Sequence, residues 1–321
     1  MPMKRIAVLT TGGDAPGMNA AIRTVVRYGI YNKLEVIGVF RGWWGLINEE
    51  LKSLDHRSVS GIINQGGTIL KTARCPEFLT EEGQTRAFNI VKKNCIDGLV
   101  VIGGDGSFTA AHRFYTKHKV PCAGIPASID NDINGIDVTI GSDTAINTAL
   151  SAIDNIRDTA TSMERIFVVE VMGRNSGFIA LQVALGGGCE DVIIPERKFD
   201  LEGMCHDIVN GNIRGKISWI IVVAEGAASA VDIAKKITEM TSLETRPVVL
   251  GHIQRGGRPT AYSRTLALTL GQAAVDCLVS GEEDLAVGMR NGKIVTIDLE
   301  TAIKKKDLEV DRLYNLIKIL T

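Results

Sequence analysis

Short apolar runs alternate with amphipathic segments along most of the chain. Apolar runs bounded by glycine or polar residues predict buried β-strands, whereas apolar residues spaced three or four positions apart predict helices. The predicted strands are Ile6–Leu9, Val36–Phe40, Leu99–Ile102, Cys122–Ile125, Ile166–Val171, Val192–Ile194, Ile217–Ala224 and Val248–Leu250. The predicted helices include Ala20–Tyr28, Glu81–Lys93, Asp143–Ile156 and Val231–Met240.

This alternation predicts an α/β fold in which a largely parallel sheet is covered by helices on both faces. The length of 321 residues suggests about two domains, and we expect a boundary near Thr139–Gly141. In sheets of this kind, ligands bind beyond the carboxyl ends of the strands. Polar and glycine-rich segments that follow predicted strands are therefore the first candidates for a functional site.

The segment after the predicted strand Cys122–Ile125 carries a hydroxyl and two carboxylates, on Ser128, Asp130 and Asp132. If the backbone is extended there, positions two apart point to the same side, so the three side chains share one space. Such a set suits metal-assisted phosphoryl transfer, with one carboxylate as the base and another near Mg²⁺. The alternative interpretation is a polar turn that caps a helix.

Glycine-rich turns follow two other predicted strands. Gly12 and Gly13 follow the first strand, and Gly103–Ser107 places Asp105 within the turn after the third. Glycines let backbone N–H groups approach a phosphate, and a carboxylate can bring a metal ion to it, although each turn could also be an ordinary loop. Thr109 stands at the last glycine position of a dinucleotide fingerprint, which argues against a dinucleotide oxidoreductase, and there is no Walker A motif.

Cationic side chains recur where predicted strands begin or end. Guanidinium groups match phosphate oxygens, so these positions predict a phosphate or sugar-phosphate pocket, although each side chain could simply be solvated. Glu225, after the predicted strand Ile217–Ala224, suits hydrogen bonds to sugar hydroxyls. The strand-end cations are Arg165, Arg174, Arg246, His252 and Arg255.

Composition narrows the classes of protein and partner. The net charge of −1 supplies no global field that would attract nucleic acid or a membrane surface. The six cysteines are scattered without a CxxC pair, which fits reduced thiols. The sequence contains no run of eighteen apolar residues, so no membrane-spanning helix is predicted, and we expect a cytoplasmic protein.

Six motifs occur in order along the chain: GGDAPGMN at 12–19, TARCPEF at 72–78, GGDGS at 103–107, IDND at 129–132, VEVMGR at 169–174 and GHIQRGG at 251–257. Together they closely resemble the bacterial ATP-dependent 6-phosphofructokinase family. The resemblance implies that the γ-phosphate of ATP is transferred to the 1-hydroxyl of fructose 6-phosphate, with Mg²⁺ as cofactor. The products would be fructose 1,6-bisphosphate and ADP, in the committed step of glycolysis.

The resemblance also implies an architecture and partners. Two doubly wound Rossmann-like domains would enclose the active site in the cleft between them. Residues 1–141 with 254–304 would bind ATP, and residues 142–253 with 305–321 would bind fructose 6-phosphate. In a homotetramer with shared active sites, Arg165 and Arg246 would reach the sugar phosphate of a neighbouring subunit. ADP or GDP would activate the enzyme and phosphoenolpyruvate would inhibit it, whereas neither nucleic acid nor membrane is an expected partner.

Residue roles follow by matching motif positions. Asp130 is implied as the base and Asp105 as the Mg²⁺ ligand, and the other implied catalytic residues are Gly13, Ser128, Asp132 and Arg174. The implied ATP-binding residues are Gly13, Arg74, Cys75, Gly104, Asp105, Gly106 and Ser107. The implied fructose 6-phosphate-binding residues are Ser128, Ile129, Asp130, Arg165, Met172, Gly173, Arg174, Glu225, Arg246, His252, Ile253, Gln254 and Arg255. The implied effector-binding residues are Arg23, Arg27, His56, Arg57, Ser58, Arg157, Gly188, Cys189, Glu190, Arg214 and Lys216.

Some positions depart from the family pattern. The usual PGTIDND is PASIDND here, because Ala127 and Ser128 replace glycine and threonine. Pyrophosphate-dependent relatives tend to carry lysine at the position of Ala127 and aspartate at that of Gly106, so ATP is favoured and pyrophosphate is the alternative donor. His56 stands where arginine is frequent, which predicts weaker or pH-dependent effector control. A non-catalytic sensor is a further alternative, disfavoured because binding alone needs no base.

Overall fold

The computed structural model describes residues 3–321, which form two units. Unit 1 contains the residues up to Asp143 together with Arg255–Lys306, and unit 2 contains Thr144–Gln254 and Asp307–Thr321. The chain therefore crosses between units at 143/144, 254/255 and 306/307, in place of the expected 141/142, 253/254 and 304/305. The Thr139–Gly141 region holds a short strand of unit 1 rather than a boundary.

Unit 1 is built on a mostly parallel sheet, with strands in the order β12-β11-β5-β4-β1-β2-β3 and β6 paired to β5. Only β3 and β12, at the two edges, pair antiparallel with their neighbours. The strands are β1 (Arg5–Thr10), β2 (Glu35–Val39), β3 (Leu51–Leu54), β4 (Gly98–Gly103), β5 (Cys122–Ser128), β6 (Ile140–Gly141), β11 (Leu285–Arg290) and β12 (Lys293–Asp298). The predicted α/β class is confirmed.

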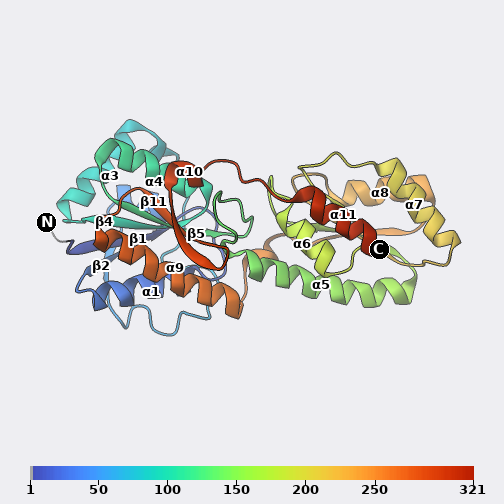
Figure 1. The fold of residues 1–321 in the computed structure, drawn as a ribbon, viewed down its shortest axis with the longest axis horizontal. Helices are drawn as coiled ribbons and strands as arrows, with labels where there is room; N and C mark the ends of the chain where they lie inside the picture. Colours follow the sequence, from blue (N-terminus) through green and yellow to red (C-terminus); the bar gives the residue numbers. More distant parts are fainter. Residues whose placement is uncertain (1–2) are drawn as a thin grey trace. The chain divides into compact units, whose positions relative to one another are not determined.

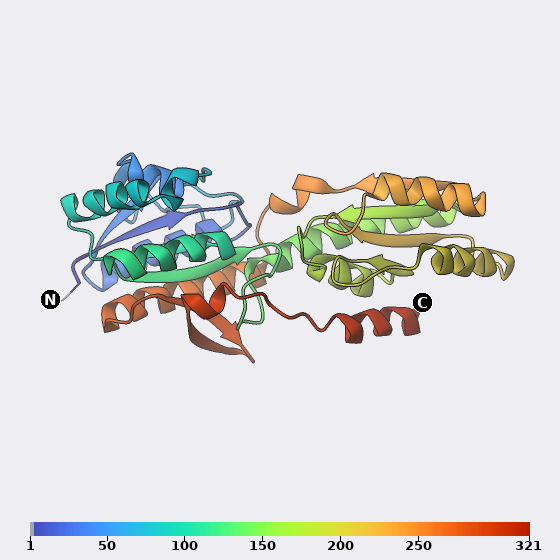
Figure 2. The same cartoon turned by 90° about the horizontal axis from the view of Figure 1, so that it is seen from above.

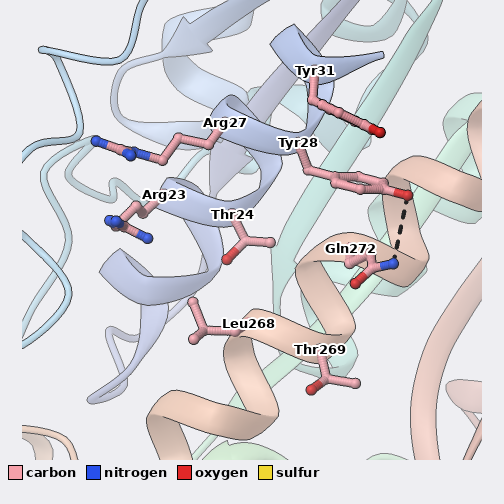
Figure 3. Close-up of a pocket in the computed structure, with 8 residues that line it drawn as sticks. All are labelled: Arg23, Thr24, Arg27, Tyr28, Tyr31, Leu268, Thr269 and Gln272. Atoms are coloured by element: carbon pink, nitrogen blue, oxygen red, sulfur yellow. Dashed lines mark hydrogen bonds between the residues drawn. The ribbon is translucent and has the colours of Figure 1, made fainter.

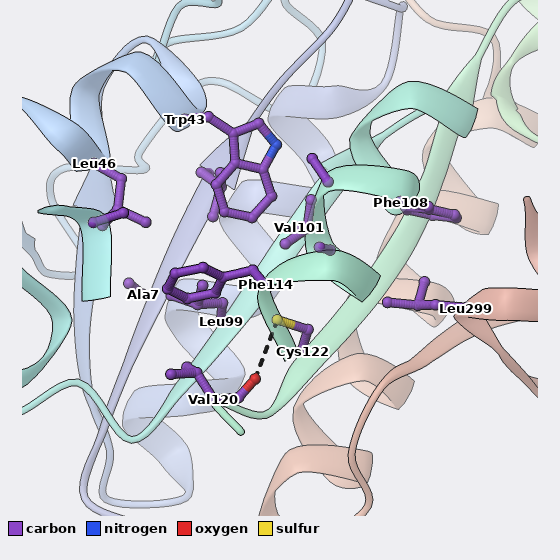
Figure 4. Packing of buried hydrophobic residues seen from close by; sticks show 14 of the residues in the cluster. Ala7, Trp43, Leu46, Leu99, Val101, Phe108, Phe114, Val120, Cys122 and Leu299 are labelled. Carbon is purple, nitrogen blue, oxygen red and sulfur yellow. Dashed lines mark hydrogen bonds between the residues drawn. The ribbon is translucent and has the colours of Figure 1, made fainter. Parts of the chain in front are cut away.

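Helices cover both faces of this sheet (Figure 1). They are α1 (Met18–Tyr31), α2 (Gly42–Ile47), α3 (Glu81–Lys93), α4 (Asp105–His118), α9 (Ala261–Ser280) and α10 (Leu299–Ala302), with a short 3₁₀ turn, η1, at Pro76–Leu79. On one face, Leu99 of β4 joins a buried cluster in which the rings of Trp43 and Phe114 lie 6.2 Å apart (Figure 4). On the other face, Ile6 of β1 lies beneath Gly29 of α1. The alternating side chains of each strand thus fill two separate layers of core.

Unit 2 contains a wholly parallel sheet in the order β10-β7-β9-β8. Its strands are β7 (Ile166–Val171), β8 (Asp191–Ile193), β9 (Trp219–Ala224) and β10 (Thr245–Val249). Its helices are α5 (Ser142–Met163, which begins in unit 1), α6 (Phe178–Gly186), α7 (Leu201–Ile213), α8 (Ala230–Thr241) and α11 (Val310–Leu320). One face packs on α7 and α8 through buried aliphatic residues that include Val168, Ile208 and Ile233. Figure 2 shows the extended segment between α10 and α11 through which the chain enters unit 2.

Element boundaries differ from expectation in unit 2. The strand expected at Val248–Leu250 begins at Thr245, so Arg246 lies inside β10 rather than before it. Pro247 is tolerated because β10 is an edge strand, where a proline need not interrupt pairing on both sides. The strand expected at Val192–Ile194 begins one residue earlier, at Asp191.

Candidate active site and effector residues

The carboxyl ends of β1, β4 and β5 lie side by side in unit 1. These strands are parallel neighbours, and their registers place Thr10 opposite Ile102 and Gly103 opposite Pro126. The segments that follow the three strands therefore leave the sheet at the same edge. This register brings together the two glycine-rich turns and the Ser128–Asp132 segment, which are distant from one another in sequence.

The Gly103–Ser107 turn fits closely between its neighbours. Ser107 donates its hydroxyl to the carbonyl oxygen of Thr11 at 3.0 Å, which ties the turn to the end of β1. A Cβ atom on Gly103 would lie 2.5 Å from that same carbonyl oxygen, and one on Gly104 would lie 3.6 Å from Cβ of Ser128. Glycine is thus required at 103 by space. The turn leads directly into α4, whose first N–H groups face the same edge and can receive an anion.

Asp105, the expected Mg²⁺ ligand, is the first residue of α4. Its side chain is exposed, and Oδ1 accepts a hydrogen bond from the Gly106 N–H at 2.6 Å. Within residues 3–321, no group of three or more His, Cys, Asp or Glu side chains is arranged to hold a metal ion. An exposed carboxylate beside an anion cradle nevertheless fits Mg²⁺, which usually keeps several waters and takes its remaining ligands from substrate phosphates.

The segment Ser128–Asp132 is not extended as supposed. β5 ends at Ser128, and Asn131 has a φ of 50°, in the left-handed region, so the alternation of a strand does not continue to Asp132. The backbone N–H of Asp130 donates to the Ser128 hydroxyl at 3.2 Å, and Asp130 itself is buried. The carboxylate of Asp130 is therefore held by a turn at the strand end, and its placement does not depend on a two-residue periodicity.

Gly13 lies against an arginine that comes from a distant part of the chain. Arg255 donates to the carbonyl oxygen of Asp14 at 3.2 Å, and a Cβ atom on Gly13 would lie 2.4 Å from its Nη1. The guanidinium group is thus seated on the first glycine turn. Arg74 is exposed and Cys75 is half-buried, just before η1, and burial raises the pKa of the Cys75 thiol.

The expected sugar-phosphate residues of unit 2 gather where β7 and β9 end. Oε1 of Glu225 accepts hydrogen bonds from the N–H groups of Gly173 and Arg174, at 3.3 and 3.0 Å. Oε1 of the fully buried Gln254 accepts from the N–H of Met172 at 2.9 Å. Two side chains thus shape the turn after β7, and Glu225 is a backbone clamp in addition to any contact with a sugar.

Arg165 and Arg246 converge on one carboxylate that the sequence analysis did not single out. Glu244 lies 3.0 Å from Nε of Arg165 and also pairs with Arg246. A hydrogen bond from Arg246, supported by Arg165, holds the pKa of Glu244 below its usual range. These arginines are therefore oriented together on one edge of the unit 2 sheet, while His252 and Ile253 nearby in sequence are exposed.

A comparison with protein families decides the affiliation. Residues 5–278 match the model of the family described as phosphofructokinase. The chain belongs to the phosphofructokinase family. The family resemblance inferred from the sequence motifs is thereby confirmed.

Individual relatives agree with this assignment. The chain is 51% identical over 319 residues to an ATP-dependent 6-phosphofructokinase of Thermotoga petrophila, covering 99% of this chain and all of that protein. A phosphofructokinase structure from Saccharomyces cerevisiae matches with a TM-score of 0.90 and 34% identity over 99% of this chain, which spans 48% of the yeast chain. A pyrophosphate-dependent phosphofructokinase structure from Marinobacter aquaeolei matches with a TM-score of 0.84 at 22% identity, over 96% of this chain and 86% of that one. The last match concerns the fold alone.

The effector residues expected from the phosphofructokinase family fall on both units. In unit 2, Glu190 is 7% exposed and lies 3.3 Å from Nζ of Lys216 and 3.9 Å from Nη1 of Arg157. Arg157 also donates to the carbonyl oxygens of Gly187 and Gly188, at 2.6 and 2.8 Å. These cations therefore belong to one cluster around a buried carboxylate. Cys189 is buried beside them, and Arg214, at the end of α7, is exposed.

In unit 1, Arg23 and Arg27 lie on the same side of α1, as their spacing predicts. They line a cavity of about 380 Å³ between α1 and α9, together with Tyr28 and Gln272 (Figure 3). His56 and Arg57 are exposed, and Ser58 forms a local turn in which its N–H donates to Asp55 at 2.8 Å.

Besides Glu244, two structural residues were not singled out by the sequence analysis. Asn19, inside the first motif, accepts from the Ile69 N–H at 2.8 Å and donates to the Gly66 carbonyl at 3.1 Å, which holds the loop before Arg74 against α1. Lys306 donates to the carbonyl oxygen of Asp137 at 3.3 Å. Neither carries a local signal, because an asparagine at a helix start and a lysine in a run of three are ordinary surface residues. No helix within residues 3–321 has both the length and the apolarity needed to cross a bilayer.

Proposed function

We propose that the chain is an ATP-dependent 6-phosphofructokinase, which transfers the γ-phosphate of ATP to the 1-hydroxyl of fructose 6-phosphate. The observation that carries this proposal is the meeting of three strand ends in unit 1. There the Gly103–Ser107 turn contacts both Thr11 and Ser128, so an anion cradle lies next to a turn that holds a buried carboxylate. As a member of its family, the chain is a kinase that acts on an alcohol group.

The residues divide the work as follows. ATP binds with its phosphates against the N-terminus of α4. The residues that bind it are Gly13, Arg74, Cys75, Gly104, Gly106 and Ser107. Asp130 accepts the proton of the attacking hydroxyl, Ser128 contacts the transferring phosphate, and Asp132 assists at the metal or the phosphate. Asp105 would hold Mg²⁺, which would supply positive charge to neutralise the phosphates. Phosphoryl transfer needs little covalent help from a protein, so positioning and charge supply most of the rate.

Unit 2 supplies most of the residues for the second substrate. Fructose 6-phosphate would bind to Met172, Gly173, Arg174, Glu225, His252, Ile253 and Gln254 of unit 2, together with Ile129 and Arg255 of unit 1. Guanidinium forks suit its phosphate, and a carboxylate suits its hydroxyls. The pairing of Arg165 and Arg246 on Glu244 supports a role for these two arginines toward a neighbouring subunit, because it keeps both guanidinium groups at one sheet edge. Shared active sites in a cytoplasmic homotetramer are part of this proposal.

Effector control is also part of the proposal. The effector residues would bind ADP or GDP as activators and phosphoenolpyruvate as an inhibitor. They are Arg157, Glu190, Arg214 and Lys216 on unit 2, and Arg23, Arg27 and Arg57 on unit 1. The cationic cluster around Glu190 supports anion binding, since one carboxylate cannot neutralise two cations. His56 is exposed and stands where arginine is frequent in the family, so effector control would be weaker or pH-dependent.

The decisive experiment is a coupled assay with fructose 6-phosphate and Mg²⁺ in which ATP and pyrophosphate are compared as donors. We expect turnover with ATP and little with pyrophosphate. Turnover with pyrophosphate alone would make the chain a pyrophosphate-dependent enzyme. Tight binding of both substrates without turnover, measured by calorimetry, would make it a sensor.

A further inference from the structure

The chain segment that follows α10 is fastened to the loop at residues 131–139, which comes directly after Asp130. The backbone N–H of Asn134 donates to the Ala302 carbonyl at 3.1 Å, and its side-chain amide donates to the Thr301 carbonyl at 3.2 Å. A little farther on, Nζ of Lys306 donates to the Asp137 carbonyl at 3.3 Å. Two points of the loop are thus tied to the end of unit 1.

The Asp137 carbonyl is also the internal anchor of this loop. It accepts a second hydrogen bond, at 3.0 Å, from the side-chain amide of Asn131, whose Oδ1 in turn accepts the Thr139 N–H at 3.0 Å. Thr139 donates its hydroxyl to the Ser128 carbonyl. Lys306 and Asn131, which lies between Asp130 and Asp132, therefore donate hydrogen bonds to the same carbonyl oxygen. Through Thr139 the same network of hydrogen bonds reaches Ser128 at the end of β5.

The backbone at the centre of this network is in the left-handed region. Asn131 has a φ of 50°, a conformation that asparagine adopts more readily than most other residues and that fits its side-chain hydrogen bonds within the loop. Asn131 is 1% exposed, and both ends of its side-chain amide are used inside the loop. The backbone between Asp130 and Asp132 is thus linked through Asn131 to the Asp137 carbonyl. Asp137 is also held by its N–H, which donates to Met289, and by its carboxylate, which accepts the Asn291 N–H.

The lysine itself sits in an unfavourable place. Lys304 and Lys305 are exposed, whereas Lys306 is half-buried. Burial lowers the pKa of Lys306 to about 8, although the carboxylates of Asp137 and Asp132 act in the opposite direction. A cation kept where it costs stability, and within electrostatic range of the candidate-site carboxylate of Asp132, is a mark of function more than of packing.

We propose that Lys306 is a positioning residue for phosphoryl transfer, which holds the Asp137 carbonyl and through Asn131 keeps Asp130 and Asp132 in their working arrangement. The inference rests on the proposed kinase function. Lys306 is also the last residue of unit 1 before the chain enters unit 2. The same hydrogen bond therefore attaches the start of the connection to unit 2 to the loop at residues 131–139.

Three variants of the full-length protein test the proposal. Lys306→Met keeps the length of the side chain but removes its charge and donors, Lys306→Arg keeps both, and Lys305→Met removes a neighbouring exposed charge. Steady-state kinetics with ATP and fructose 6-phosphate give kcat and both KM values. Amide hydrogen exchange, read by mass spectrometry on peptides covering residues 129–141, reports on the loop in the absence of substrates.

We expect Lys306→Met to lower kcat about tenfold or more with KM values changed less than about threefold, because small misplacements of reacting groups cost up to ~10²-fold. Exchange at residues 129–141 should accelerate, Lys306→Arg should restore most of kcat, and Lys305→Met should behave as wild type. Wild-type kcat in Lys306→Met would overturn the proposal, as would equal losses in the methionine and arginine variants. If the wild type had no kinase activity, the proposed function would fail, and unchanged exchange in Lys306→Met would separately refute the attachment of the loop.

Discussion

Gly106 is the position where charge can be added to the candidate ATP site with little cost to the fold. It is exposed in the first turn of α4, and a Cβ atom there would meet nothing within 4 Å. The substitution Gly106→Asp therefore creates no clash. A carboxylate near the start of a helix interacts favourably with the helix dipole by about 0.3–1 kcal/mol, so stability should be unchanged or slightly higher.

Binding of ATP should respond in the opposite sense. If the N-terminus of α4 receives the phosphates, the new carboxylate lies beside them. Two like charges about 4 Å apart repel by about 4 kcal/mol at the effective dielectric constant typical near a protein surface. Since about 1.4 kcal/mol corresponds to a factor of ten, affinity for ATP should fall by up to ~10³-fold. Gly106→Ala adds a methyl group without charge and should show only a small part of this loss.

The assay combines the KM for ATP at saturating fructose 6-phosphate with the melting temperature of each variant. Gly103→Ala is a structural comparison, because its Cβ would lie 2.4 Å from the Ser107 hydroxyl, and overpacking of this kind costs about 1–3 kcal/mol of stability. The expected pattern is a stable Gly106→Asp with lost ATP affinity and an unstable Gly103→Ala. A Gly106→Asp variant with the wild-type KM for ATP would refute the placement of the phosphates at this turn.

Three further outcomes are expected. Asp130→Asn should lower kcat by ~10²–10⁴-fold with little change in either KM, as steady-state kinetics would show, and an unchanged kcat would remove Asp130 as the base. Lys216→Met should lower the free energy of unfolding by about 1–3 kcal/mol in urea titrations, because it removes one of the two cations that pair with the buried Glu190 carboxylate. Adding Glu190→Gln to this variant should recover part of the lost stability. If the stability losses of the two substitutions simply added in the double variant, this pairing would be contradicted. The pKa of Lys306 is lowered to about 8 in the folded protein. Its burial therefore lowers the free energy of unfolding by the full amount below that pH, and this loss of stability disappears as pH rises toward the ordinary pKa of lysine. The melting temperature of the wild type relative to Lys306→Met should therefore rise between about pH 8 and 10.5, and a difference independent of pH would contradict the assigned burial.

Several elements were predictable because their cause is local. Glu81–Lys93 forms the helix expected for it, since the Thr80 hydroxyl caps its start by accepting the Gly83 N–H at 3.1 Å and amphipathic spacing continues to its end. Ile166–Val171 forms the strand expected for it because an apolar run of that length is stable only when buried on both faces. The β11–β12 hairpin was missed, although Asn291–Gly292 is a typical turn signal, because β12 is a mostly exposed edge strand with little apolar pattern.

The sequence alone determined the family and the α/β class, and it predicted the residues of a phosphofructokinase site, because motifs and periodicity are formed by neighbouring positions. Only the tertiary structure decided which of those residues meet. Three contacts depend on strand order and on where the chain crosses between units. They are the contact of Arg255 with Gly13, the ion pairs of Glu190 with two cations, and the hydrogen bond from Lys306 to Asp137. Asn131 is the sharpest case: two-residue spacing suggested a strand that aligns Ser128, Asp130 and Asp132, and a left-handed turn held by distant contacts replaces it. Local sequence specifies chemical groups, whereas their mutual geometry is set by long-range packing.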